Sequence, residues 1–299
     1  MKICTTAYVS EYTGSRLMKG ETGEILLAHS TGVYLRFGEE IFLLCDRKWG
    51  VLPIGISVEN YEQVMCQLRL EAGQKALLEK DELLVPGGSF VLKRWSCSKE
   101  PAVESEPNST RIAQAAEGLA ALGKTTGLSL LVLPLVLGRA VDSALPHNPY
   151  FERAYADFKA LTEAMQAEEI ERVAHCTQNL LGLGTGLTPS ADDIFLGMLY
   201  VFRTLPCDCE TAVSAFRDTV SSFAAARTNQ ISAAYLNAIL QGAPFERMDR
   251  VYRGLCGKES LHIEELVQIG SNSGSEMLLG MLIALRICGY HVSKREELP

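Results

Sequence analysis

Two ten-residue segments of this chain share one pattern. The segment "SADDIFLGML" (residues 190–199) aligns without gaps on "SGSEMLLGML" (residues 273–282), with serine first, an acid fourth and glycine eighth. An interior glycine costs a helix about 1 kcal/mol relative to alanine. Glycines at equivalent positions, Gly197 and Gly280, therefore indicate that another backbone approaches both helices closely. We expect the two helices to cross there, which would bring the loops before them to one end of a bundle.

The start of each segment has the spacing of a capping box. In this motif a serine oxygen and an acid three residues later each bind an orphan N–H group. Asp193 and Glu276 stand at the acid positions of this motif, whereas Asp192 stands outside it and has no capping role. This spacing predicts that Asp193 caps its helix and that Asp192, about 100° around the helix, faces the preceding loop and carries function.

That preceding loop is rich in glycine. "LGLGTGLTPSADD" (Leu181–Asp193) has glycine at three alternate positions, then Thr-Pro-Ser and two acids. Glycine loops before helices commonly bind anions, but two aspartates in the first turn would repel one. A neutral amide, or an anion bridged by a metal ion, resolves this conflict.

Composition limits the kind of protein. The chain has 299 residues, is 47% hydrophobic and has a net charge of −8, which argues against nucleic acid or an anionic membrane as its main partner. The N-terminal "MKICTTAYVSEYTGS" has no signal-peptide core. Nine scattered cysteines suit reduced thiols. We expect a cytoplasmic protein.

The texture of the sequence changes near residue 100, which predicts an α+β chain. We expect a β-rich domain over residues 1–98, a linker rich in Ser, Pro and Glu over 99–110, and a larger, mostly α-helical domain over 111–299. Short β-prone runs occur at residues 24–29, 33–37, 41–45, 51–58 and 89–95. Helical patterns occur at residues 110–123, 148–167, 169–180, 190–204, 209–227, 232–240, 245–255, 263–269 and 275–288.

Two other motifs carry less weight. "GLAALGKT" (residues 118–125) has phosphate-loop spacing, but it follows an alanine-rich helix instead of a strand, and Gly123 fits a helix C-cap. Cys207 and Cys209 form a C-x-C pair with no second pair or histidine nearby in the sequence, so we do not predict a zinc site.

The segment "GLGTGLTPSADDIFLGML" resembles the signature of the AllH family. Thr185 and Ala191 replace a proline and a glycine that are usual in that signature. The resemblance continues through "RTNQIS" (residues 227–232) and "GSNSGSEMLLG" (residues 270–280). One branch of the family is the smallest subunit of oxamate carbamoyltransferase in allantoin breakdown, a part of purine catabolism. The resemblance therefore implies a carbamoyltransferase subunit that moves a carbamoyl group between a small ureido acid and phosphate.

This implied reaction assigns candidate roles to the motif residues. Its tetrahedral oxyanion needs fixed N–H donors, which the loop and the second segment would supply. The predicted catalytic residues are Asp192, Asp193, Thr188 and Ser190. The predicted substrate-binding residues are Gly184, Gly186, Arg227, Thr228, Asn272, Ser273 and Glu276. Asp192 and Asp193 are also candidate ligands for a divalent Mg²⁺ or Mn²⁺ ion, and we predict no other cofactor.

Two further hypotheses remain open. The chain is alternatively a non-catalytic assembly subunit of such a complex, or a related carboxyl- or amide-transfer protein with another substrate. For the carbamoyltransferase subunit, the expected partners are the other subunits of the complex and a small anionic substrate with phosphate, and neither nucleic acid nor a membrane.

Overall fold

The computed structural model describes residues 3–17, 20–95, 106–122, 124, 126–142 and 148–290. It is 52% helix and 18% strand, with an eight-stranded barrel before a helical part, which confirms the α+β prediction. The packing divides the chain into Met1–Lys99 with Gln241–Arg247, and Glu100–Leu240 with Met248–Pro299. The predicted linker falls largely outside the described residues, so the domain boundaries at 98, 99–110 and 111 stay predictions.

The first unit is a closed barrel. Its strands follow the order β1-β5-β4-β3-β2-β6-β7-β8. The β1–β8 and β4–β5 pairs are parallel, and the other pairs are antiparallel. The strands are β1 (Ile3–Val9), β2 (Thr22–His29), β3 (Gly32–Phe37), β4 (Glu40–Asp46), β5 (Gly55–Val58), β6 (Lys75–Glu79), β7 (Glu82–Val85) and β8 (Gly88–Arg94), with helices α1 (Glu11–Arg16), η1 (Arg47–Trp49) and α2 (Tyr61–Gln67) between them.

Aromatic side chains help to fill the barrel. Phe37, Phe42 and Phe90 are buried in its core, together with Tyr61 from α2. Apolar residues alternate along β6 and β7, where buried positions follow exposed or half-buried ones, as expected of strands with one buried face. Strands β1, β6 and β7 were not predicted from the sequence.

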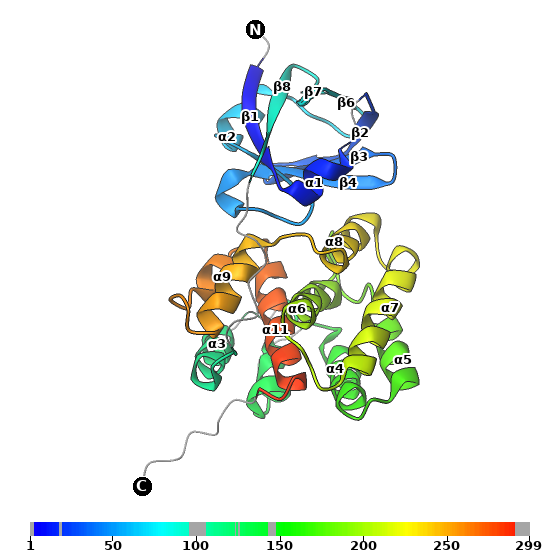
Figure 1. Cartoon of the computed structure of the whole chain (residues 1–299), viewed down its shortest axis with the longest axis vertical. Coiled ribbons are helices and arrows are strands. Elements are labelled where there is room, and N and C mark those ends of the chain that lie inside the picture. Colours follow the sequence, from blue (N-terminus) through cyan, green and yellow to red (C-terminus); the bar gives the residue numbers. More distant parts are fainter. Residues whose placement is uncertain are drawn as a thin grey trace. The chain divides into compact units, whose positions relative to one another are not determined.

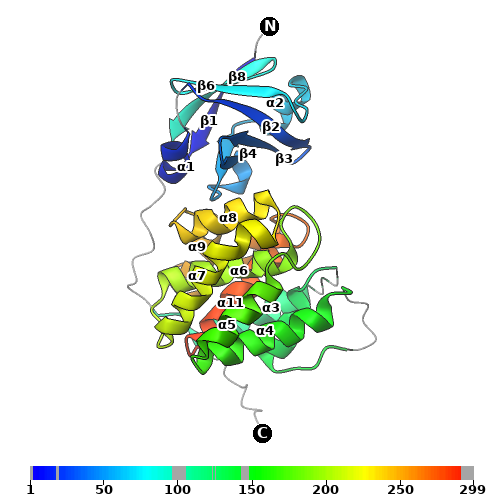
Figure 2. The same ribbon diagram turned by 90° about the vertical axis from the view of Figure 1, so that its right-hand side faces the viewer.

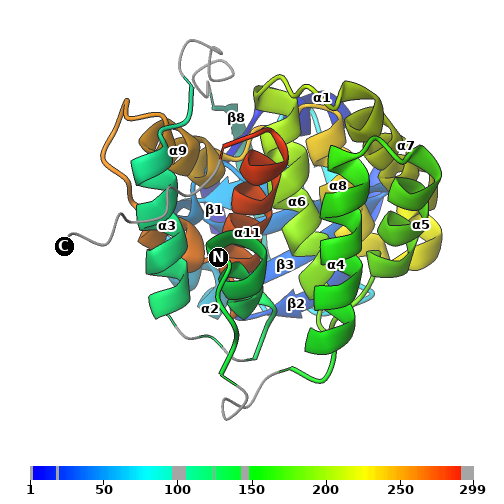
Figure 3. The same cartoon turned by 90° about the horizontal axis from the view of Figure 1, so that it is seen from below.

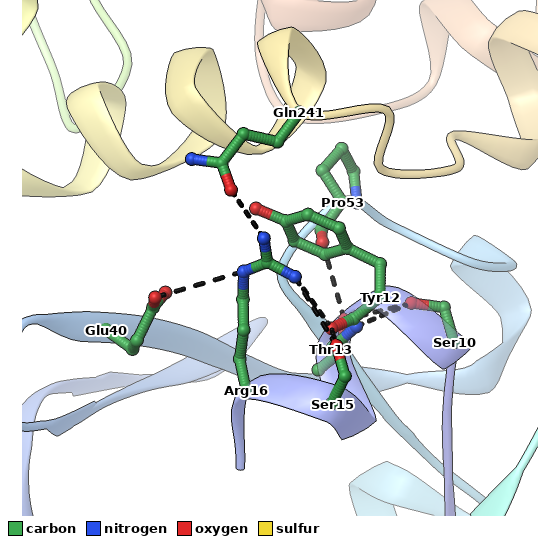
Figure 4. Close-up of polar contacts among 8 residues, drawn as sticks. All are labelled: Ser10, Tyr12, Thr13, Ser15, Arg16, Glu40, Pro53 and Gln241. Carbon is green, nitrogen blue, oxygen red and sulfur yellow. Dashed lines mark hydrogen bonds and ion pairs between the residues drawn. The ribbon is translucent and has the colours of Figure 1, made fainter.

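The short segment Gln241–Arg247 belongs to the barrel unit although it lies far along the chain. Arg16 at the end of α1 donates a hydrogen bond to Gln241, forms a 3.9 Å ion pair with Glu40 and stacks on the ring of Tyr12 (Figure 4). Glu246 accepts a 3.0 Å hydrogen bond from the N–H group of Val51. These contacts join the segment to α1 and to the chain after η1.

The second unit is helical, and two of its helices form its centre. Helix α11 packs along α6, which also contacts α8, while α4, α5 and α7 pack on one another (Figures 1 and 2). Among the described residues, no helix is long and apolar enough to cross a bilayer. The helices are α3 (Ser109–Ala121), η2 (Ser129–Leu131), the π-helical turn η3 (Leu133–Leu137), α4 (Phe151–Gln166), α5 (Ile170–Leu180), α6 (Ser190–Thr204), α7 (Glu210–Arg227), α8 (Gln230–Leu240), α9 (Glu246–Leu255), α10 (Ile263–Val267) and α11 (Ser273–Ile287).

The predicted helix crossing is confirmed. A Cβ atom at Gly197 would lie 2.0 Å from the backbone oxygen of Met277, and one at Gly280 would lie 1.9 Å from that of Ile194. Figure 3 shows α6 and α11 side by side at the centre of this unit. Each helix therefore needs glycine at its midpoint because the backbone of the other occupies the place of a side chain.

Candidate functional site

The loop before α6 is shaped by glycines that no other residue can replace without strain. Gly182 and Gly184 have φ angles of 77° and 129°. A Cβ atom at Gly182 would lie 2.2 Å from the backbone oxygen of Arg227, and one at Gly184 would lie 2.5 Å from the backbone nitrogen of Ser190. These two glycines let the loop pack tightly against the end of α7 and the start of α6.

The outer part of the same loop presents free hydrogen-bond donors. Thr185, Gly186 and Leu187 are exposed. None of the residues that the structure describes accepts a hydrogen bond from their backbone N–H groups. Gly186 has a φ of 97°, yet nothing lies within 4 Å of a Cβ atom built there. Only the backbone conformation requires this glycine, and the conformation leaves the donors available to a ligand.

Asp192 is completely buried, and its carboxylate is fully hydrogen bonded. Its Oδ1 accepts the N–H group of Gly182 at 2.8 Å, and its Oδ2 accepts the hydroxyl groups of Thr228 and, at 2.7 Å, Ser232. Burial raises the pKa of Asp192, and the three hydrogen bonds act in the opposite direction. The carboxylate faces the glycine loop, as its helical position predicted, and ties that loop to the connection between α7 and α8.

Asp193 has a different environment, although it is equally buried. Its Oδ2 accepts the hydroxyl group of Thr188 at 3.0 Å, whereas Oδ1 has no hydrogen-bond partner among the described residues. Burial and the neighbouring Glu276 raise the pKa of Asp193 well above its usual range, and the hydroxyl groups of Ser273 and Thr188 offset this in part. The carboxyl group therefore keeps its proton to a higher pH than an ordinary aspartate does.

Glu276 is the corresponding acid of α11. It is 1% exposed, and its Oε1 accepts the N–H group of Leu128 at 2.8 Å. Burial raises the pKa of Glu276, while hydrogen bonds from Leu128 and from the hydroxyl group of Ser190 lower it. A side chain at Gly127 would meet this carboxylate at 2.5 Å, so glycine is required where the two segments approach.

The two helix starts meet through hydroxyl groups. Thr188 Oγ1 lies 3.2 Å from Ser273 Oγ, which confirms that both loops lie at one end of the helix pair. The contacts are crosswise, since Ser273 of α11 acts on Asp193 of α6 and Ser190 of α6 acts on Glu276 of α11. The internal repeat thus places two acids and three hydroxyl groups in one cluster, which we call the acid–hydroxyl cluster: Thr188, Ser190, Asp193, Ser273 and Glu276.

The predicted capping boxes are wrong. The N-cap of α6 is Pro189 and that of α11 is Asn272, and neither has a side-chain cap. The N–H groups of Asp192 and Asp193 both donate to the backbone oxygen of Pro189, at 2.9 and 3.1 Å. Because the extended Pro189 ends the loop, Ser190 is already the first helical residue, and its hydroxyl group turns to the other helix. The predicted capping role of Asp193 is therefore also wrong.

The other predicted binding residues differ in their surroundings. Arg227 is exposed at the end of α7. The hydroxyl group of Thr228 donates a hydrogen bond to Asp192. Asn272 accepts a 3.0 Å hydrogen bond from the hydroxyl group of Thr126. Of the donors expected near α11, the N–H group of Gly274 binds the backbone oxygen of Ile269 at 3.0 Å. The catalytic and substrate-binding roles of all these residues stay predictions.

The segment around Leu128 was missed as a part of this site. The sequence was considered as a phosphate loop only over the preceding residues 118–125, and the tertiary contact between the N–H group of Leu128 and Glu276 has no local signal. Within the described ranges, no group of three or more His, Cys, Asp or Glu residues is arranged to hold a metal ion. Asp192 also has both oxygens engaged by donors, which a metal ion at this residue would have to displace, and the metal role of the two aspartates stays a prediction.

The comparisons with known proteins bear on this same part of the chain. No solved structure matches the chain. Residues 180–285 match the family model described as oxamate carbamoyltransferase subunit AllH. The matched residues include the glycine loop, helix α6, all but the last two residues of α11 and all five members of the acid–hydroxyl cluster. Over residues 180–285, the chain thus carries the AllH family pattern, and the resemblance read from the glycine-loop motif is confirmed.

Proposed function

We propose that this chain is a subunit of an oxamate carbamoyltransferase-type complex. In this proposal the complex moves a carbamoyl group between a small ureido acid, such as oxalurate, and phosphate. The observation that carries the proposal is the coincidence of two findings. The segment that matches the AllH family model also brings free loop donors next to two buried acids with raised pKa values.

The loop would bind the negative charge of the reaction. Attack on a carbamoyl carbon forms a tetrahedral oxyanion, which preorganised N–H groups stabilise best where they need not reorganise. The N–H groups of Thr185, Gly186 and Leu187 are such donors, and they precede the N-terminus of the 15-residue helix α6. The helix dipole favours an anion at this end.

The acid–hydroxyl cluster would handle the proton and the amide. In this proposal Asp193 carries a proton, and a protonated carboxyl group does not repel an anion, which resolves the conflict between the glycine loop and its acids. Thr188 belongs to the loop and donates to Asp193, so a proton can pass between this buried carboxyl group and the loop through the threonine hydroxyl. We assign general acid–base work to Asp193 acting through Thr188, and amide orientation to the hydroxyl groups of Thr188 and Ser273.

A second candidate is a non-catalytic assembly subunit. Asp192 favours it, because all its hydrogen bonds are internal and its carboxylate has no exposed surface. In that case the motif stabilises the bundle, and the loop binds a partner chain instead of a substrate.

Calorimetry on the pure chain separates these candidates. We expect oxalurate, carbamoyl phosphate or phosphate to bind, and we would repeat each titration with Mg²⁺ and with Mn²⁺. Gly186→Ala should weaken binding at least tenfold, because the strained φ reorients the loop donors. Gly138→Ala is the matched control, since Gly138 also has a positive φ, 66°, and open space around a Cβ atom.

The same titrations can reject the proposal. If none of these ligands binds the wild-type chain, and Gly186→Ala also leaves the activity of a reconstituted complex unchanged, the assembly role is favoured. Equal effects of the Gly186 and Gly138 substitutions would show that the loss reflects general strain and not the loop donors.

A further inference from the structure

Three cysteines of the helical unit meet in space although the sequence presents only a C-x-C pair. Cys207 and Cys209 have their Sγ atoms 2.8 Å apart. The thiol of Cys288 forms a hydrogen bond with that of Cys207 and also lies close enough to Cys209 to interact with it electrostatically. All three are free cysteines. The sequence could not predict that Cys288 lies near this pair, because Cys288 comes from the end of α11.

The helix pair explains this meeting. Helices α6 and α11 have 15 residues each, start together and cross at equivalent glycines, so they also end together. Cys207 follows the end of α6, and Cys288 is the C-cap of α11. At 1.5 Å per residue, the thiols lie roughly 22 Å along the helices from the acid–hydroxyl cluster.

We propose that Cys207, Cys209 and Cys288 form a thiol–disulfide exchange site. In this site Cys207 is the central thiol, which bonds to Cys209 and can exchange that bond for one to Cys288. Nothing in the carbamoyl-transfer proposal requires this chemistry, and the site lies at the other end of the helix pair.

The exposure and burial of the three thiols set the order of events. Cys207 and Cys288 are partly exposed, whereas Cys209 is buried. Burial raises the pKa of Cys209 to about 12 and also raises the pKa of Cys288. The thiolate is the reactive form of cysteine, so the partly exposed Cys207, next to both other thiols, is the entry point.

The chemistry balances with a low-molecular-weight disulfide as the oxidant. The Cys207 thiolate attacks one sulfur of the disulfide RSSR, which gives a mixed disulfide and releases RS⁻. The Cys209 thiol then loses its proton and attacks the Cys207 sulfur, which forms the Cys207–Cys209 bond and releases a second RS⁻. Both RS⁻ groups take up the two thiol protons, so RSSR is reduced to two RSH. Attack of Cys288 on the Cys207 sulfur afterwards breaks that bond, forms Cys207–Cys288 and restores the Cys209 thiol.

Peptide mapping tests the proposal on the full chain. The folded protein is incubated with oxidised glutathione, its remaining thiols are alkylated, and it is digested with trypsin without reduction. Cleavage after Arg203 and Arg217 leaves Cys207 and Cys209 in one peptide, and cleavage after Arg286 and Lys294 isolates Cys288. We expect the first peptide to appear lighter by two hydrogens, or joined to the second.

Single variants assign the roles of the thiols. In Cys209→Ser the product should shift to the Cys207–Cys288 bond, and Cys207→Ser should form neither bond. Cys256→Ser is the matched control, because Cys256 is partly exposed in the same unit and hydrogen bonds to Tyr252 instead of the trio. Thermal melts under reducing conditions establish that each variant is folded.

The outcomes are decisive in both directions. Either predicted disulfide in the wild-type chain supports the proposal. Complete alkylation of the three thiols, or glutathione adducts without an internal bond, overturns it. A Cys209–Cys288 bond in Cys207→Ser also overturns it, because Cys207 would then not be the central thiol.

Discussion

At the midpoints of α6 and α11 the two halves of the internal repeat are interchangeable, whereas at their N-terminal ends they are not. Gly197 faces the backbone of α11 as Gly280 faces that of α6, at nearly equal distances. At the ends, Glu276 binds the N–H group of Leu128, while one oxygen of Asp193 has no hydrogen-bond partner among the described residues. Packing therefore imposes symmetry where the two backbones touch, and the chemistry of the helix starts is free to differ.

The largest predicted effect breaks the symmetric midpoint. Gly280→Ala should lower the free energy of unfolding by more than about 3 kcal/mol, because the added methyl group would meet a backbone oxygen that cannot move aside. Urea unfolding measures this loss. Gly118→Ala in α3 is the control, since a Cβ atom there meets only the flexible end of the Ile263 side chain, at 2.6 Å. A loss at Gly280 no larger than at Gly118 would contradict the close crossing.

The next prediction concerns the helix starts. Asp192→Asn should destabilise the protein by about 1–3 kcal/mol, because the amide cannot accept all the hydrogen bonds of the carboxylate. Gly182, Thr228 and Ser232 all donate to Asp192, so at least one donor becomes unpaired in the interior. Chemical unfolding at neutral pH measures the change. A variant as stable as the wild type would show that these hydrogen bonds add little to the fold.

The sequence predicted the helix pair better than it predicted the chemistry at its ends. The crossing followed from a local rule, since an interior glycine is costly in a helix unless something packs against it. The roles of Asp192 and Asp193 depended on where α6 begins, and Pro189 moves that start by one residue relative to a serine N-cap. Because Ser190 is the first helical residue, Asp193 is the fourth and not the third, where a capping-box acid stands, whereas Asp192 still faces the loop.

Residues that join a site only through tertiary contacts could not be predicted from local sequence patterns. The N–H group of Leu128 reaches Glu276 from the loop before η2, and Cys288 reaches Cys207 from the end of α11. In the barrel, β1, β6 and β7 have short or mixed patterns, whereas the continuous apolar run of β4 predicted its strand. Sequence periodicity thus identified the helices and strands that bury a whole face. The tertiary contacts of the other segments depend on the complete fold.

The smallest predicted effect is the pH dependence of the stability that Asp193 contributes. The pKa of Asp193 is raised in the folded protein, so its contribution to stability is complete below the pKa of the unfolded chain. That contribution is lost as the pH rises through the folded pKa. Asn cannot ionise and keeps an oxygen that accepts from Thr188. Asp193→Asn should therefore match the wild type near about pH 3.5, below the unfolded pKa, and exceed it by about 1 kcal/mol near about pH 8.5. Thermal melts at both pH values measure the difference, with exposed Asp218→Asn as the control. If Asp193→Asn destabilises the protein equally at both pH values, the carboxyl group is ionised in the fold, and the proton that we assign to Asp193 must be held elsewhere.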